Sequence, residues 1–362
     1  MFNSITLWGL LGAVIGAVIV GAVTLCIHFF LTDRNWFSLR IRGSLVLVGG
    51  VLGFVLASTG QVSGAQYSEA LAYQNSAGIS YAKGDLTSAL RDYSAAIKLN
   101  PKLATSYYGR GLVEYAKGDR NAAFVDLSQS IALDPDDMNS YYYRGLLRRE
   151  DLGVTNPVVL DGEVSDFSQV IRLNPKLADA YQYRAQALYL REEYQWALTD
   201  LNQAILLNPQ LVDVYRDRGN VRRAVGDNNG ALGDYEEALR INPRDTFAFL
   251  YDGDVRRILG DYVGAISAYD QVVKLLPKTP MAYEARAEAR AARRDFNGAL
   301  ADYAIALQLN PQYTDAFYGR GVIRSLKGDV VGATSDFRYT LWLQPNHTQS
   351  KSMISYIAQQ GH

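Results

Sequence analysis

The chain has 362 residues, of which 48% are hydrophobic and 20% are charged, and its formal net charge is -1. This near-neutral balance excludes the basic surface typical of nucleic-acid-binding proteins, so we expect no nucleic-acid partner. The single cysteine excludes an intrachain disulfide framework, and the three histidines are too scattered for a zinc site or a histidine-based catalytic group.

The first 65 residues contain two uncharged, mostly apolar stretches. Residues 1–32 carry no charged side chain, and a helix over Leu7–Leu31 is long enough to cross ~30 Å of hydrocarbon. A short loop with three arginines separates it from the second stretch, which starts at Gly43. We therefore expect residues 1–65 to form a transmembrane hairpin, with spans at about 5–31 and 43–62. A single span is the alternative.

The arginines of this loop set the expected topology. Basic loops lie on the cytoplasmic side of a membrane. Two spans then make a multi-pass protein whose remaining domain is extracytoplasmic, whereas a single span leaves that domain in the cytoplasm. Small residues follow one another every four positions in the first stretch, at Gly9, Ala13, Ala17 and Gly21. Such faces allow close helix packing in lipid, so self-association through them is also expected.

The rest of the chain has an internal period. Eight prolines are spaced by 34, 40 and then five times 34 residues. A fixed period of this size is typical of a repeat solenoid. In most units the proline follows Asn or Asp, and the eight dipeptides are Asn100-Pro101, Asp134-Pro135, Asn174-Pro175, Asn208-Pro209, Asn242-Pro243, Leu276-Pro277, Asn310-Pro311 and Gln344-Pro345.

Each unit has the pattern of two helices. An aromatic residue is followed four positions later by Ala or Gly, as in Tyr215 and Gly219, so both lie on one helical face. A Gly-Asp turn signal then follows in five units, and the second helix carries an alanine with a large residue four positions later. Glycine suits the left-handed end of one helix, aspartate caps the next, and the proline ends that second helix.

This pattern resembles the tetratricopeptide repeat and covers about residues 68–346. The resemblance implies an all-α, right-handed α-solenoid of eight helix pairs in residues 66–347, with a concave inner groove. Residues 348–362 have an apolar stripe but no following unit, which predicts a capping helix. The third unit departs from the pattern, with six extra residues around 152–164 and Glu163 in place of the alanine. We interpret the insertion as a lengthened loop, with a partner-contacting loop as the alternative.

Two columns of arginine follow the same period. Six arginines directly precede the small residue, and in five units an aspartate stands sixteen positions later, as in Arg218 and Asp234. The sixth unit has Asp252 instead and lacks the second aspartate. Loss of both partners together favours a structural ion pair, because an arginine left alone in an interface is costly. The second column, Arg148, Arg222, Arg256, Arg290 and Arg324, stands where the family usually has tyrosine.

The resemblance also implies which residues line the groove, namely the positions one, five and eight after the leading aromatic. Our candidate partner-binding residues are Tyr108, Tyr115, Tyr142, Arg149, Tyr189, Arg216, Asn220, Arg223, Asp254 and Arg257, with Glu284, Glu288 and Tyr318 further along. Some relatives clamp a C-terminal carboxylate. Arg216 and Asn220 match that clamp, but Tyr251, Met281 and Ala285 do not, so we expect no such clamp.

The sequence contains no motif for catalysis. We find no phosphate-binding glycine loop, metal-ligand cluster or serine or cysteine triad, so we expect no enzyme activity, catalytic residue, metal or cofactor. We expect a membrane-anchored scaffold that binds proteins or peptides and aids assembly of a membrane or envelope complex. The alternative is an accessory subunit that binds polysaccharide or lipid-linked chains for an envelope enzyme or secretion machine.

Overall fold

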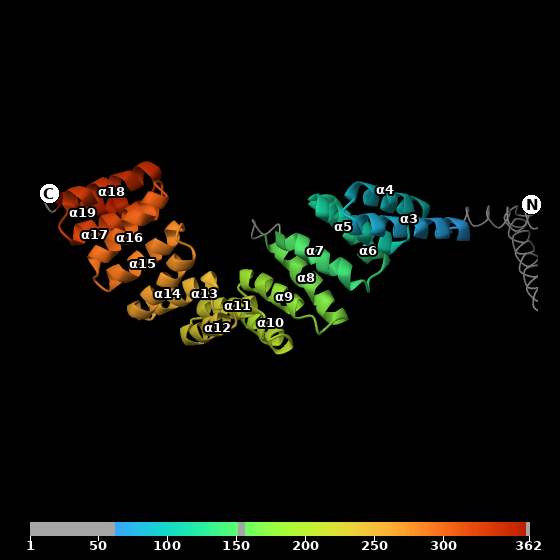
Figure 1. Cartoon of the computed structure of the whole chain (residues 1–362), viewed down its shortest axis with the longest axis horizontal. Coiled ribbons are helices and arrows are strands. Elements are labelled where there is room, and N and C mark those ends of the chain that lie inside the picture. The colour runs from blue at the N-terminus through green and yellow to red at the C-terminus, as the bar shows by residue number, and fades with distance from the viewer. Residues whose placement is uncertain (1–61, 151–155, 360–362) are drawn as a thin grey trace, which may run out of the picture.

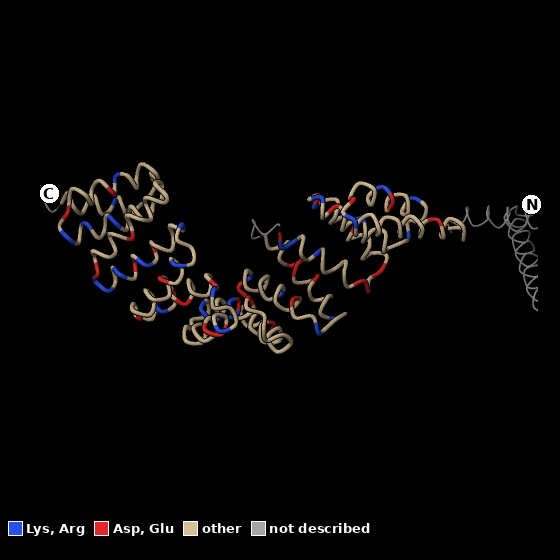
Figure 2. The backbone as a smooth tube through the Cα atoms, in the orientation of Figure 1, with Lys and Arg blue, Asp and Glu red and all other residues tan. Residues whose placement is uncertain are grey.

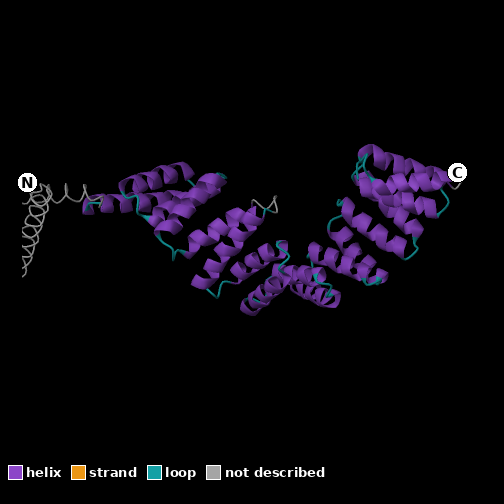
Figure 3. Cartoon of the chain, turned by 180° about the vertical axis from the view of Figure 1, so that it is seen from behind, coloured by secondary structure: helices purple, strands orange, loops and turns teal. Residues whose placement is uncertain are grey.

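The computed structural model describes residues 62–150 and 156–359, and within them it contains helices and no strand (Figures 1 and 3). This confirms the predicted all-α repeat solenoid. The seventeen helices of these residues are α3 (Gly64–Ala82), α4 (Leu86–Leu99), α5 (Ala104–Lys117), α6 (Arg120–Leu133), α7 (Met138–Glu150), α8 (Pro157–Leu173), α9 (Ala178–Leu190), α10 (Tyr194–Leu207), α11 (Val212–Ala224), α12 (Asn228–Ile241), α13 (Thr246–Ile258), α14 (Tyr262–Leu275), α15 (Pro280–Ala292), α16 (Phe296–Leu309), α17 (Thr314–Leu326), α18 (Val330–Leu343) and α19 (Thr348–Gln359).

The helices stack in chain order into an arc (Figure 1). Each odd-numbered helix from α3 to α17 is the first of its unit and packs against the second helix of that unit. From α5 to α19, each odd-numbered helix also packs against the second helix of the preceding unit. First helices of successive units also touch one another, at α3–α5, α9–α11, α11–α13, α13–α15 and α15–α17. At the bend, α9, α11 and α13 lie on the inner side of the arc and α10, α12 and α14 on the outer side (Figure 1). The first helices therefore line the concave face.

In six units the residue before the recurring proline, Asn or Asp, ends the second helix through a side-chain hydrogen bond. Asn100 has extended backbone angles, and its side-chain Oδ1 accepts a hydrogen bond from the N–H of Lys102 at 3.1 Å. This turn gives the N–H of Lys102, beyond the end of the helix, an acceptor, while the proline prevents the helix from continuing. The same bond occurs at Asp134, Asn174, Asn208, Asn242 and Asn310.

The Gly-Asp dipeptide forms the turn inside each of five units. Gly118 has φ of 84°, in the left-handed region that glycine favours, and the Asp119 carboxylate accepts the N–H of Ala122 at 3.0 Å. Three units lack this dipeptide, and in two of them the turn lies within the described residues. There Glu192 and Arg294 adopt φ of 61° and 65°, a conformation that costs a side-chain-bearing residue free energy. The turn geometry is thus kept even where the sequence does not favour it.

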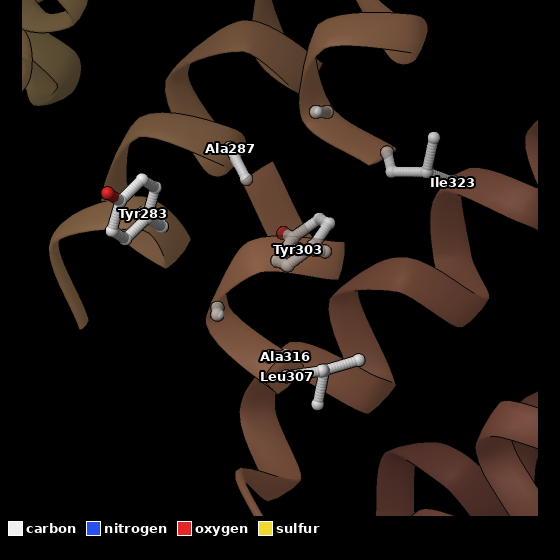
Figure 4. Close-up of a cluster of buried hydrophobic side chains, with 8 residues drawn as sticks. Tyr283, Ala287, Tyr303, Leu307, Ala316 and Ile323 are labelled. Atoms are coloured by element: carbon white, nitrogen blue, oxygen red, sulfur yellow. The ribbon is translucent and has the colours of Figure 1, made fainter. Parts of the chain in front are cut away.

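Small residues let the two helices of a unit come close. The repeated alanine of the second helix is fully buried in seven units, and the large residue four positions later packs against the small residue of the first helix. A Cβ at Gly219 would lie 2.5 Å from the ring of Tyr235, so no larger residue fits there. Figure 4 shows how one such cluster joins α15, α16 and α17, with Tyr303 facing Ala287. The core is therefore continuous from unit to unit.

The predicted membrane localisation is contradicted. In residues 62–150 and 156–359, no helix has both the length and the apolar character needed to cross a bilayer. The multi-pass prediction, the extracytoplasmic repeat domain and the single-pass alternative are withdrawn with it. The apolar stretches on which these predictions were based, and the small-residue face expected to self-associate, fall at residues 1–61, outside the described residues.

Candidate functional site

All ten candidate groove residues lie on first helices and are half-buried. Tyr108 and Tyr115 are on α5, Tyr142 and Arg149 on α7, and Tyr189 on α9. Arg216, Asn220 and Arg223 are on α11, and Asp254 and Arg257 on α13. They form an aromatic part, whose rings contact one another, and a charged part, whose side chains form ion pairs.

The aromatic part forms a row of rings across three units. The ring centroids of Tyr108 and Tyr143 are 6.1 Å apart, those of Tyr143 and Tyr142 are 5.7 Å apart, and those of Tyr142 and Tyr183 are 6.2 Å apart. The Arg149 guanidinium lies 4.9 Å from the Tyr183 ring centroid and so caps the row. Burial raises the pKa of Tyr108 and of Tyr142, so both hydroxyls stay protonated at neutral pH. We call these rings, with Arg149 excluded, the tyrosine row.

Two predicted tyrosines make contacts outside the tyrosine row, although the Tyr115 ring also lies 6.2 Å from the ring of Tyr143. The Tyr115 hydroxyl donates to Glu150, and this bond raises the pKa of Tyr115 to about 12. Glu150 also pairs with Arg120 at 3.1 Å, which ties α5, α6 and α7 together. Tyr189 packs against Tyr194 of α10, with ring centroids 5.8 Å apart. These two side chains are engaged in contacts between helices.

The charged part of the groove is paired within itself. Arg216 pairs with Asp213 and with Asp245, Arg223 lies 3.8 Å from Asp254, and Arg257 lies 3.6 Å from Glu288. Two groove acceptors are also used by buried tyrosines of the second helices: Asn220 accepts from Tyr235 and Asp254 from Tyr269. A charged ligand would have to displace these internal partners.

The far end of the groove carries two glutamates on α15. Burial, together with the neighbouring Glu288, raises the pKa of Glu284 to about 8. Glu284 is therefore mostly protonated at neutral pH. Tyr318 packs against His347, which lies between α18 and α19, with ring centroids 4.9 Å apart.

The first arginine column forms ion pairs, as its spacing predicts. Arg110, Arg184, Arg286 and Arg320 each donate two hydrogen bonds to the aspartate sixteen residues later. Five arginines of the column also donate from Nη1 to a residue of the preceding unit: Arg110 to Ser94, Arg144 to Ser128, Arg184 to Ser168, Arg218 to Asn202 and Arg286 to Asp270. The first arginine column therefore links adjacent units. Its guanidinium groups are already paired, so they do not form a row of anion-binding sites.

The first unit satisfies its aspartate in a different way. Ser76 replaces arginine there, and the aspartate, Asp92, accepts from Ser76 at 2.7 Å and from Arg91 at 2.9 Å. Arg110 of the next unit does not reach it and bonds Ser94 and Asp126 instead.

The second arginine column pairs with the same aspartates. Arg222, Arg290 and Arg324 donate from Nη1 to Oδ2 of Asp234, Asp302 and Asp336 at 2.7–2.8 Å, and Arg148 donates to Oδ2 of Asp166. In each of these units the same Oδ2 atom also accepts from Nε of the first-column arginine. In the sixth unit Arg256 pairs with Asp252 on its own helix at 2.8 Å. One carboxylate thus accepts two guanidinium groups, which its four lone-pair sites allow.

Three residues outside our candidate set belong to the groove. Tyr143 and Tyr183 stand two positions after the leading aromatic and complete the tyrosine row. Tyr93 comes from a second helix, yet it lines a cavity of the concave face beside Gly78 and Gly109. Glycine at two groove positions was the sequence signal for this opening. Among the described residues, no group of three or more His, Cys, Asp or Glu is arranged to hold a metal ion.

Comparisons with known proteins agree with this architecture. A family model described as a TPR repeat matches residues 79–118, and one described as tetratricopeptide repeat matches residues 216–280 and 284–341. No curated protein sequence matches the chain. The C-terminal part of a TPR repeat-containing protein from Cytophaga hutchinsonii has a TM-score of 0.56 at 18% identity, covering 68% of this chain and 98% of that chain.

Two further solved structures are similar. The APC/C hetero-tetramer Cut9-Hcn1 gives a TM-score of 0.52 at 15% identity, covering 75% of this chain and 52% of that chain. YrrB, described as a TPR protein with an unusual peptide-binding site, gives 0.45 at 24% identity, covering 52% of this chain and 97% of that chain. At these identities the likeness concerns the fold alone.

Proposed function

We propose that this chain, whose repeated helix pairs are tetratricopeptide repeats, is an interaction scaffold that holds an extended segment of a partner protein along its concave face. Such a scaffold would aid the assembly of a protein complex. Arginine–aspartate pairs stabilise the repeats. Because the inner positions of the first helices are not needed for this role, their residues can differ between units. Those positions carry the tyrosines and arginines that typically anchor protein interfaces.

The observation that carries this proposal is the tyrosine row. Tyr108, Tyr142, Tyr143 and Tyr183 are half-buried on a concave surface and come from three successive units. Rigid aromatic side chains give large contact area at low entropic cost, because only two side-chain torsions are fixed. The charged part of the groove supports the proposal less, since its members neutralise one another.

Site-specific photo-crosslinking in cells tests this function. A photoreactive phenylalanine analogue replaces Tyr142 on α7 in one variant and Trp196, which is 67% exposed on α10, in the matched outer-face control. We expect discrete protein adducts from position 142 and none from position 196. Mass spectrometry of the adducts then separates protein partners from polysaccharide, the alternative ligand. Equal adducts from both faces, or adducts from position 196 alone, contradict groove binding.

A further inference from the structure

Asp217 of α11 is a groove carboxylate without an internal cation. It is half-buried and stands at the repeat position that Tyr143 and Tyr183 occupy in the tyrosine row. Neighbouring groove residues such as Arg223 and Asp254 form ion pairs with each other. In the part of the chain that the structure describes, no Lys, Arg or His lies within ion-pair distance of the Asp217 carboxylate.

Two glutamines of α9 hold this carboxylate by one of its oxygens. Gln182 Nε2 donates to Oδ2 of Asp217 at 2.7 Å, and Gln186 Nε2 donates to the same oxygen at 2.6 Å. The two glutamines are four residues apart, so they lie on one face of α9. The other oxygen, Oδ1, accepts no hydrogen bond from a described residue, and it is not buried. Asp217 is therefore fixed in position with one oxygen available to a ligand.

The charge of Asp217 is not neutralised by these contacts. Burial raises the pKa of Asp217, and the hydrogen bonds from Gln182 and Gln186 oppose this shift. The charged groups that act on it, Arg216 and Asp213, do so in opposite directions, and Arg216 is already held in two ion pairs. A cation brought by a ligand would therefore stabilise the ionised form of Asp217.

A second acceptor at the same contact also lacks a donor. Gln186 gives its amide N–H to Asp217, and its Oε1 atom is buried without a hydrogen-bond partner among the described residues. A buried acceptor without a donor costs free energy. Ammonium and guanidinium groups carry several N–H donors and no acceptor. The contact between α9 and α11 thus favours a ligand group that brings donors and positive charge.

We infer that the contact between α9 and α11 binds a cationic side chain, lysine or arginine, of the partner segment, with Asp217 Oδ1 as its anion. The tyrosine row ends at Tyr183 on α9, and α11 is the next first helix along the groove. A segment that lies along the row therefore continues onto Asp217. This inference rests on the proposed function and specifies the chemistry of the partner.

Selection of peptides from a random nonapeptide phage library against the full chain tests this inference. We expect lysine or arginine to be enriched in the peptides that the wild type selects, and Asp217→Asn to lose this enrichment. A selected basic peptide should bind Asp217→Asn about 10- to 100-fold more weakly than the wild type, the effect of one charge-assisted hydrogen bond. Asparagine keeps an acceptor for the glutamines, so we expect this variant to keep its thermal stability.

A change in the peptide gives a second measurement that does not depend on the variant alone. Replacement of the basic residue of a selected peptide by glutamine should weaken binding to the wild type by the same factor. It should leave binding to Asp217→Asn unchanged, because the two changes remove the same contact. Full weakening on both proteins would place the basic residue elsewhere in the groove and overturn the inference.

Glu237→Gln is the matched control. It removes one negative charge from an exposed residue of α12, on the outer side of the arc, where Glu237 pairs with Arg240 of the same helix (Figure 1). We expect this variant to select basic peptides like the wild type. The inference is overturned if the selected peptides lack basic residues, if Asp217→Asn selects them as strongly as the wild type, or if Glu237→Gln also loses them. A wild type that enriches no peptide overturns it as well, and adducts from position 142 then decide whether the scaffold function still stands.

Discussion

Glu163 is the one charged residue at the position where every other unit has a buried alanine. It is fully buried, and neither carboxylate oxygen has a hydrogen-bond partner among the described residues. Arg149 lies 3.7 Å away on α7, Arg148 and Asp166 are the other charged groups around it, and Tyr183 of α9 packs on Arg149. Burial outweighs these arginines and raises the pKa of Glu163 to about 7 from its usual 4.5.

This shift predicts a pH-dependent stability. Between pH 4.5 and 7 the folded chain binds more protons than the unfolded chain at Glu163, so its stability falls as the pH rises through this window and is constant above it. The loss is on the order of 3 kcal/mol. Glu163→Gln removes the titration, so we expect this variant to gain stability relative to the wild type between pH 5 and pH 8, measured by urea unfolding. A difference that is the same at both pH values would contradict the assignment.

At the scale of the element, the second arginine column depends on glycine in the facing helix. The units with arginine at this position are the third, fifth, sixth, seventh and eighth, and the same five units have glycine directly before the buried position of the second helix. In four of them the arginine Nη1 contacts that glycine's carbonyl, as in Arg148 and Gly162 at 2.7 Å. The arginine guanidinium occupies the space on the second helix that a side chain at this glycine position would otherwise fill.

This arrangement predicts opposite effects for two glycine substitutions in second helices. A Cβ at Gly162 would lie 2.5 Å from the guanidinium carbon of Arg148, whereas a Cβ at Gly233 meets nothing within 4 Å. Alanine favours helix over glycine by roughly 0.5–1 kcal/mol. We therefore expect Gly233→Ala to raise the unfolding midpoint and Gly162→Ala to lower it, because Arg148 must leave Asp166. If both variants are stabilised, Arg148 is not held by this contact.

At the scale of the whole molecule, stability is built from contacts between neighbours. Lys and Arg alternate with Asp and Glu along the solenoid, as Figure 2 shows, and many of them are used in pairs within or between adjacent units. In such a one-dimensional stack, each unit depends on its own packing and on the interface with the next unit. The last unit, α17 and α18, depends on α19, where Ile357, Met353 and Ile354 pack against Ala333 and Phe337.

Removal of α19 therefore has a local effect. Deletion of residues 348–362 exposes Phe337, and we expect amide hydrogen exchange to accelerate in α17 and α18 while α9 and α10 keep their protection. Deletion of residues 360–362 alone serves as the control and should change neither. Equal loss of protection along the chain would show that the solenoid unfolds as a single cooperative body.

Much of the fold is predictable from the sequence because the repeat is encoded in local spacings. Residues four positions apart define helical faces, and Asn-Pro and Gly-Asp encode turns through backbone restrictions. An arginine that recurs together with an aspartate sixteen positions later indicates a contact within one unit. Each of these signals depends on residues close in the chain, so the amino-acid order alone is enough to recognise it. The placement of the ten groove residues on first helices follows from the same register.

Contacts between units were decided by the tertiary structure. The pairing of Arg223 with Asp254, the approach of Tyr142 to Tyr183, and the opening of Tyr93 between Gly78 and Gly109 depend on how far one helix pair is rotated against the next. No spacing along the chain specifies that rotation, because it results from side-chain packing across the interface. The sequence by itself therefore determined the repeating unit and its arginine–aspartate pairs. Only the stacked molecule decided which groove residues neutralise one another and which form the tyrosine row.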